Sequence, residues 1–150
     1  SFLGEYTGLP VEHDPRFREL NFGEREGLTW REAWERFPEG MRAWIDGDET
    51  QIPGSETHFQ AGERFATALT DVLETFPMKQ TLVVVAHGAV LRTGACRFLG
   101  IPEAQWRLFG GLSNCHWSVM EESRHGEWAQ WRLTEWNSGS LPEPVMSDDE

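Results

Sequence analysis

The most constraining feature of the sequence is a continuous apolar run, Thr81–Ala86 (TLVVVA), which is followed at once by His87 and Gly88. A short apolar run rich in β-branched residues is typical of a strand that is buried on both faces, as in a parallel sheet. A helix is predicted directly after it, over Ala89–Leu99. A chain that places a buried strand before a helix is expected to fold with helices covering a sheet.

Two further helices are predicted upstream of this strand. A Thr-x-x-Glu capping box opens one at Thr29, and a Thr-x-x-Gln box opens the other at Thr57. The second helix keeps apolar residues at helical spacing as far as Pro77. The first has an aromatic face over Trp30–Phe37, which suits a lid over a pocket or ordinary core packing.

The C-terminal third predicts a hairpin and then a tail. Strands are expected at Asn114–Met120 and Glu127–Leu133. Together with the upstream elements they define one α/β domain over residues 1–137. Residues 138–150 are rich in proline, serine and acids, a composition that predicts disorder.

The charge of the chain restricts its partners. It has 13 basic and 25 acidic residues, a formal net charge of −12, which argues against nucleic acid or an anionic membrane surface. No apolar run approaches the roughly 18 residues of a membrane span. Cys96 and Cys115 are too few for a zinc motif, and we expect both to be reduced core residues of a cytoplasmic protein. An anionic substrate would need a local pocket of arginine and histidine.

His87 is the first candidate for chemistry. It stands where the buried strand ends and a helix begins, and ligands of open α/β sheets bind at the carboxyl ends of strands. The helix N-terminus attracts anions such as phosphate, and Gly88 allows a close backbone approach. The alternative is a core histidine that is hydrogen-bonded to a carbonyl.

Glu19 is the second candidate. It follows two arginines in Arg16-Phe17-Arg18-Glu19, on a predicted loop bordered by glycines, where a carboxylate can serve as proton donor or acceptor. From charge alone, a solvated cluster of ion pairs with these arginines is the stronger interpretation.

Three sequence blocks, taken together in their order along the chain, favour a functional role for Glu19 over an ion-pair cluster. RELNFGEREGLTW, PGSET and VVVAHGAVLR resemble consecutive blocks of the histidine phosphatase superfamily, the phosphoglycerate-mutase-like enzymes. The similarity covers Leu9 to about Trp136. It implies a three-layer α/β sandwich with a mainly parallel sheet. It also implies a metal-independent phosphatase that needs no cofactor and acts on a small phosphorylated metabolite through a phosphohistidine intermediate.

The resemblance assigns roles to residues. Glu19 becomes the general acid for the leaving group, and His87 stabilises the charge of the phosphoryl group. Gly88 and the loop residues Ser55 and Glu56 become substrate-binding residues, although Ser55 stands where the family usually has a second glycine. The arginine matching Arg64 is expected to be structural.

A narrower resemblance concerns the substrate. LFGGLSNCHW and WRLTEWN are similar to actinobacterial phosphatases that act on glucosyl-3-phosphoglycerate. Asn114, in the first of these blocks, is predicted at the start of a strand and is expected to shape the substrate pocket.

One departure from the family is large. Its hallmark Arg-His-Gly, at the end of a first strand, supplies the nucleophilic histidine, and no such block precedes the matched region. Arg124-His125-Gly126 is set aside because it lies in a predicted turn after a polar segment. We therefore expect the C-terminal part of a histidine phosphatase, inactive alone. The first strand would lie beside Thr81–Ala86, so its absence would uncover Val83, Val84 and Val85.

Several alternatives remain open at this stage. A second copy of the chain, forming a homodimer, or an N-terminal segment could complete the sheet. The activity could be that of a phosphoglycerate mutase-type phosphotransferase. The chain could also be an inactive relative that binds a phospho-ligand or a partner protein. A serine hydrolase is remote, because no Gly-x-Ser-x-Gly elbow occurs.

Overall fold

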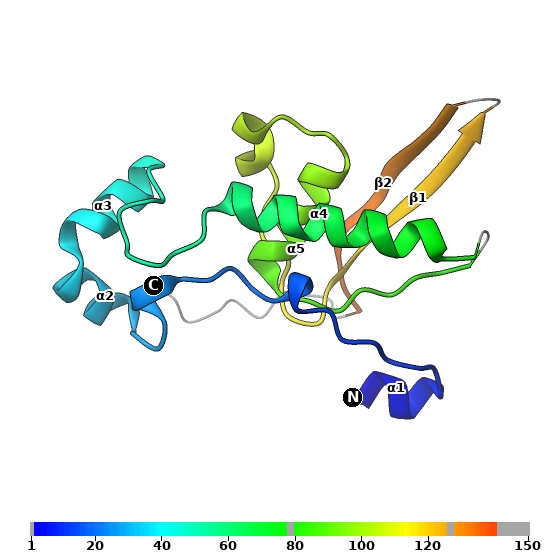
Figure 1. The fold of residues 1–150 in the computed structure, drawn as a ribbon, viewed down its shortest axis with the longest axis horizontal. Helices are drawn as coiled ribbons and strands as arrows, with labels where there is room; N and C mark the ends of the chain where they lie inside the picture. Colours follow the sequence, from blue (N-terminus) through cyan, green and yellow to red (C-terminus); the bar gives the residue numbers. More distant parts are fainter. Residues whose placement is uncertain (1, 78–79, 126–127, 141–150) are drawn as a thin grey trace.

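The computed structural model describes residues 2–77, 80–125 and 128–140 (Figure 1). Helices α4 and α5 lie at the centre, with the β1–β2 hairpin at one end and α2 and α3 at the other. The elements in chain order are α1 (Phe2–Thr7), η1 (Pro15–Phe17), η2 (Gly23–Arg25), α2 (Trp30–Arg36), α3 (Pro38–Asp46), α4 (His58–Thr75), α5 (Gly88–Phe98), η3 (Glu103–Leu108), β1 (Trp117–His125) and β2 (Trp128–Ser138). No described helix is long and apolar enough to cross a membrane.

The main core lies between α4 and α5. Its fully buried members come from both helices and from the loop before them, namely Leu20, Ala61, Phe65, Leu69 and Val90. Phe65 of α4 lies directly on Gly94 of α5, where any Cβ would collide with the ring. Close packing of this kind brings the N-terminus of α5 up to the segment that carries Glu19.

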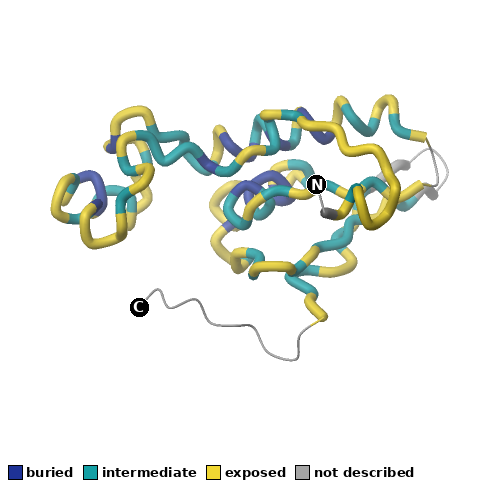
Figure 2. The backbone as a smooth tube through the Cα atoms, turned by 90° about the horizontal axis from the view of Figure 1, so that it is seen from below, coloured by how far each residue is buried: buried dark blue, intermediate teal, exposed yellow. Residues whose placement is uncertain are grey.

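A second, smaller core holds α2 and α3 together. It consists of Ala33, Met41 and Ile52, with Leu28, Trp34 and Phe37 packed around them. Figure 2 shows buried segments in these two separate places, the α4–α5 pair and the α2–α3 region. The predicted capping boxes are confirmed at Thr29 and Thr57, which explains why α2 and α4 begin where they do.

The predicted hairpin is confirmed, with shifted boundaries. β1 and β2 pair antiparallel, with Met120 opposite Leu133 and Glu122 opposite Trp131. β1 begins at Trp117 instead of Asn114, because residues 114–115 form a turn in which Cys115 has a left-handed φ of 60°. Cys96 is buried as expected, but the prediction that Cys115 is a core residue is wrong, since it is exposed.

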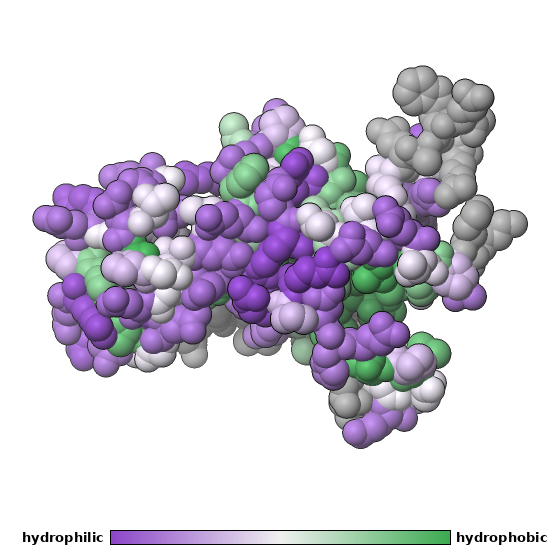
Figure 3. All heavy atoms as spheres, viewed as in Figure 1, coloured by the Kyte–Doolittle hydropathy of each residue, from purple (hydrophilic) through white to green (hydrophobic). Residues whose placement is uncertain are grey.

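Thr81–Ala86 is extended but carries no assigned strand, and it forms no backbone hydrogen bond with another described segment. Its side chains alternate: Leu82, Val84 and Ala86 pack against the main core, whereas Val83 and Val85 are 67% and 70% exposed. The prediction that these valine side chains are exposed is thus confirmed for Val83 and Val85 and wrong for Val84. Figure 3 shows apolar surface below α4, in the region through which this segment runs.

The sheet itself is described only in part. The described strands form one two-stranded antiparallel sheet, so the expected three layers and mainly parallel sheet stay predictions. The expected tail falls largely on residues 141–150, which lie outside the described residues, and β2 extends to Ser138.

Candidate active site

Glu19 lies against the first turn of α5. Its Oε1 accepts hydrogen bonds from the backbone N–H groups of Leu20, at 2.8 Å, and Val90, at 3.0 Å. Its Oε2 accepts a hydrogen bond from the N–H of Ala89 at 3.3 Å. The carboxylate thus satisfies two backbone donors that a helix N-terminus leaves without intrahelical partners. The two α5 residues that it contacts, Ala89 and Val90, follow His87 by two and three positions, and His87 immediately precedes the helix.

The structure excludes the two alternatives considered above, a core histidine at position 87 and an ion pair of Glu19 with the neighbouring arginines. His87 is exposed and makes no hydrogen bond to a described residue, so it is not a core histidine bonded to a carbonyl. Glu19 forms no ion pair with a described arginine, since Arg16 pairs with Asp14 and Asp71 instead. Among the described residues, neither side chain is therefore explained by a structural ion pair.

Gly88 occupies a tight position. An added Cβ would lie 3.1 Å from the carbonyl oxygen of Leu112, so the loop before β1 runs close beside the start of α5. The Gly88 N–H donates to no described acceptor, and it remains available to a ligand. The loop is itself held by Asn137, whose Oδ1 accepts a hydrogen bond from the Ser113 N–H at 2.8 Å.

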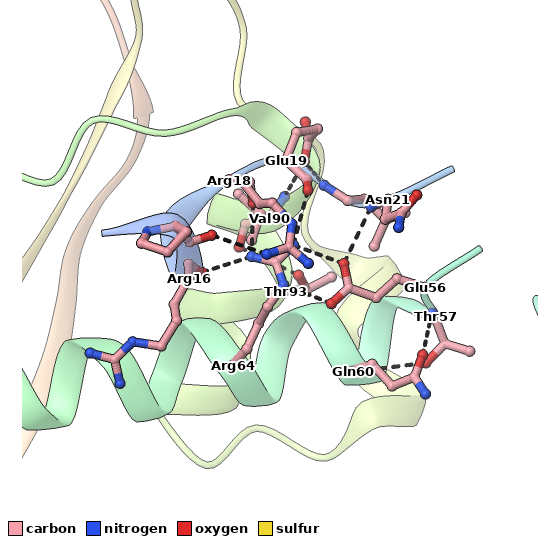
Figure 4. A network of polar contacts seen from close by, with 12 residues as sticks. Arg16, Arg18, Glu19, Asn21, Glu56, Thr57, Gln60, Arg64, Val90 and Thr93 are labelled. Atoms are coloured by element: carbon pink, nitrogen blue, oxygen red, sulfur yellow. Dashed lines mark hydrogen bonds and ion pairs between the residues drawn. The ribbon is translucent and has the colours of Figure 1, made fainter. Parts of the chain in front are cut away.

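Arg64 of α4 holds the Glu19 segment in place (Figure 4). Its Nη1 donates to the carbonyl oxygens of Arg16, at 2.7 Å, and Arg18, at 2.8 Å. Its Nη2 donates to the carbonyl oxygen of Glu19 at 2.9 Å. The remaining donors form a bidentate pair with the carboxylate of Glu56, at 2.7 and 2.8 Å. All five N–H donors of the guanidinium are used, which confirms the structural role expected for Arg64.

Glu56 completes the set of hydrogen bonds by which Arg64 holds the Glu19 segment, and we call this set the Arg64 clamp. Its carboxylate pairs with Arg64 and also accepts a hydrogen bond from the Asn21 N–H at 3.2 Å. Burial by itself would raise the pKa of Glu56. Hydrogen bonds from Arg64 and Asn21, together with the charge of Arg64, outweigh burial and lower the pKa. Direct contact of Glu56 with substrate stays a prediction, whereas its support of the Glu19 segment is visible in Figure 4.

The loop around Ser55 packs backbone to backbone on the segment after Glu19. Gly23 has a left-handed φ of 59°, and any Cβ there would collide with the carbonyl oxygen of Pro53. Phe22 and Ser55 form an isolated β-bridge. Gly54 has a φ of 74°, whereas Ser55 has no positive φ. Serine in place of a second glycine therefore imposes no strain on this loop.

The structure brings some of the predicted site residues together and leaves others apart. Glu19 is hydrogen-bonded to the first turn of α5, which directly follows His87, whereas Glu56 contacts the Glu19 segment through Asn21 and Arg64. Asn114 is exposed in the turn before β1, and its carbonyl oxygen, not its side chain, meets His116 at 3.0 Å. A cavity shared by Glu19 and His87 stays a prediction, because neither the cavity beside α2 nor the one between α4 and Arg97 includes them.

Sequence reasoning missed two features of this region. Asn21 helps to anchor Glu56, and its Oδ1 accepts a hydrogen bond from the Gly23 N–H at 2.9 Å. The asparagine before a left-handed glycine was an available signal for this turn. Asn137 gave no comparable signal, because its left-handed φ of 53° appears only in the folded chain.

The arrangement places an acid–base group and an imidazole beside a helix start that is open to solvent. A carboxylate at this position can exchange a proton with an oxygen leaving a phosphorus atom, and an imidazole can donate to a phosphoryl oxygen. Among the described residues, no group of three or more His, Cys, Asp or Glu side chains is gathered as a metal site.

Comparison with known proteins identifies the class of protein to which this fold belongs. Residues 1–139 match the histidine phosphatase superfamily, branch 1, and the chain belongs to that family of enzymes. The glucosyl-3-phosphoglycerate phosphatase of Mycobacterium tuberculosis is 30% identical over 154 residues, which cover 92% of this chain and 67% of that protein. The phosphoserine phosphatase 1 of Hydrogenobacter thermophilus is 30% identical over 131 residues, covering 82% and 59%.

Solved structures agree with the sequence comparison. The mycobacterial glucosyl-3-phosphoglycerate phosphatase in complex with inorganic phosphate superposes with a TM-score of 0.78 at 28% identity. The superposition covers 91% of this chain and 69% of that one.

Proposed function

We propose that this chain carries the proton-transferring and charge-stabilising part of a phosphatase site. Glu19 protonates the oxygen that leaves phosphorus and later takes a proton from the attacking water. His87 and the Gly88 N–H donate hydrogen bonds to the phosphoryl oxygens. The single observation that supports this assignment is the position of the Glu19 carboxylate on the first turn of α5, directly after His87.

The nucleophile of the proposed reaction is a histidine outside these 150 residues. It attacks phosphorus, the P–O bond to the ester oxygen breaks, and a phosphohistidine forms, which water then hydrolyses. Arg124 and His125 lie at the end of β1 in the hairpin and not before a helix, so neither is proposed as the nucleophile, which we expect beside an anion-binding helix N-terminus. The reaction needs no metal or cofactor in this scheme.

The proposed substrate is a small phosphorylated metabolite, with glucosyl-3-phosphoglycerate as the first candidate. The support is the similarity to mycobacterial phosphatases that are named for this compound. A phosphotransferase of the phosphoglycerate mutase type is the second candidate, because probable phosphoglycerate mutases are also among the relatives.

The test uses a protein in which this chain is joined to the segment that supplies the nucleophile. Hydrolysis of glucosyl-3-phosphoglycerate, 3-phosphoglycerate and phosphoserine is compared by release of inorganic phosphate. His87→Ala should lower turnover by about a hundredfold or more, as expected for a charge-stabilising donor. His13→Ala, an exposed histidine ahead of the matched motifs, is the control and should leave turnover unchanged. Unchanged turnover in His87→Ala would overturn the assignment.

A further inference from the structure

Asn137, near the end of β2, is joined to the loop that runs beside the start of α5. Its Oδ1 accepts a hydrogen bond from the Ser113 N–H at 2.8 Å, and its Nδ2 donates to the Oγ of Ser113 at 3.4 Å. Its own backbone N–H donates to the Oγ of Ser118 at 3.2 Å. The backbone of Asn137 is therefore tied to β1, and both ends of its amide are bound to one residue of the loop.

A β-bulge explains why this side chain leaves the sheet. The pairing register of the hairpin shifts between Trp117 and Val119, which leaves two residues of β2 opposite Ser118. The second of them is Asn137, with a left-handed φ of 53°, a conformation that asparagine adopts more readily than most residues. A bulge redirects a side chain away from the regular alternation of a strand. The amide of Asn137 reaches the loop for that reason.

The loop itself, Phe109–Ser113, has few other attachments. At its first residue, the ring of Phe109 packs edge-on against Trp136, with the ring centres 5.4 Å apart. The two glycines that follow have open space where a side chain would stand. Beyond the turns that flank the loop, Asn137 is its one hydrogen-bond partner among the described residues. Loss of this side chain therefore releases the end of the loop that is nearest to β1.

That end of the loop lies against the start of α5. A Cβ added to Gly88 would stand 3.1 Å from the Leu112 carbonyl oxygen, so the two backbones are in contact. Leu112 directly precedes Ser113, and Gly88 directly follows His87. A displacement of Ser113 therefore also moves the carbonyl group that packs on Gly88.

We propose that Asn137 is a positioning residue of the phosphoryl site, which acts through Ser113 and Leu112 on the Gly88 N–H. The inference rests on the proposed function, because that function assigns this N–H to a phosphoryl oxygen. A donor stabilises developing charge best when its direction is fixed before the reaction. Because the bond to the oxygen strengthens in the transition state, loss of Asn137 should lower kcat more than it raises KM.

The test compares variants of a protein in which this chain is joined to the segment that supplies the nucleophile. Asn137→Gly removes the side chain alone, because glycine adopts a left-handed φ without strain. The Ser113 amide proton should exchange at least tenfold faster, the Gly88 amide signal should shift in NMR spectra, and kcat for an alkyl phosphate should fall about tenfold. Asn137→Asp keeps an acceptor for the Ser113 N–H and should restore most of kcat.

The control variant is Thr134→Ala. The Oγ1 of Thr134 donates to the Val119 carbonyl oxygen at 3.3 Å, beside the second register shift of the hairpin. The change removes a hydrogen bond from the same hairpin and none from the loop, so kcat and the Gly88 signal should stay unchanged.

Four outcomes would each overturn the proposal. They are an unmoved Gly88 signal in Asn137→Gly, an unchanged kcat in that variant, an equal loss in Asn137→Asp, and an equal loss in Thr134→Ala. His87→Ala reports separately on the proposed function. Normal turnover in His87→Ala would remove the phosphoryl site, and the Gly88 signal would still decide whether Asn137 positions this backbone.

Discussion

The Oε1 atom of Glu19 accepts a hydrogen bond from the backbone N–H of Val90 at 3.0 Å, although the two residues are 71 positions apart in the sequence. The other end of Glu19 is fixed as well, because its carbonyl oxygen is bound by Arg64. The carboxylate is therefore oriented by the protein before any substrate arrives. Such preorganisation is what a proton-transferring group requires.

Glu19→Gln should slow the hydrolysis of alkyl phosphates by about 10² to 10⁴-fold, because the amide cannot deliver a proton to the leaving oxygen. Aryl phosphates such as p-nitrophenyl phosphate have good leaving groups and should lose much less. The measurement is kcat/KM for both ester types, in a protein that includes the nucleophile. Glu12→Gln, an exposed acid of the same segment, should change neither value, and equal losses on both esters would remove Glu19 from the acid role.

Arg64→Met should destabilise the chain by about 3 kcal/mol or more, because it leaves the carboxylate of Glu56 buried without its partner. The side chains of Arg64 and Glu56 are only 14% and 13% exposed, so water cannot replace the lost contacts well. Urea unfolding measures the effect. A double-mutant cycle with Glu56→Gln should show strong coupling, and additive effects would contradict the clamp.

The same pair predicts a pH dependence of stability. The pKa of Glu56 is lowered in the folded chain, so the unfolded chain binds more protons as the pH falls below the ordinary value for glutamate. The stabilisation is complete above that value and is lost as the pH falls through the folded pKa. The free energy of unfolding should therefore drop more steeply with acid in the wild type than in Glu56→Gln. Arg64→Met should flatten the profile in the same way, and parallel profiles would refute the prediction.

The 150-residue chain by itself should lack phosphatase activity. Glu19 and His87 can assist phosphoryl transfer, but the proposed reaction has no nucleophile within this chain. The purified chain should hydrolyse p-nitrophenyl phosphate no faster than its His87→Ala variant, as measured by absorbance of the released phenolate. Robust hydrolysis that depends on His87 would require His125 to be reconsidered as the nucleophile.

The helices were largely predictable, because their signals are local. Capping boxes and helical spacing predicted α2 and α4, and the helix predicted over Ala89–Leu99 is α5, with both ends shifted by one residue. Residue types in order also pointed to Glu19 and His87. Their meeting at one helix start is a tertiary contact that neither segment encodes alone.

The pairing of strands and the exposure of individual side chains were harder to predict. Thr81–Ala86 has the composition of a buried strand, yet a strand needs a hydrogen-bonded neighbour, and no described segment supplies one. The small number of cysteines made Cys115 look like a reduced core residue, whereas it lies exposed, with a left-handed φ, in the turn before β1. Arg25 shows the limit most clearly, because nothing in RELNFGEREGLTW distinguishes a guanidinium that contacts the rings of Phe22 and Trp44 from an ordinary surface arginine.

The two separate cores have a consequence for motion. The core beneath α2 and α3 contains only Ala33, Met41 and Ile52, so it buries far less apolar surface than the α4–α5 core. Local unfolding follows such differences, so we expect amide protons of α2 and α3 to exchange with solvent through openings that leave α4 and α5 intact. Glu19 and Arg64 are expected to belong to the slowly exchanging unit, because Arg64 is part of α4 and Glu19 is hydrogen-bonded to the first turn of α5.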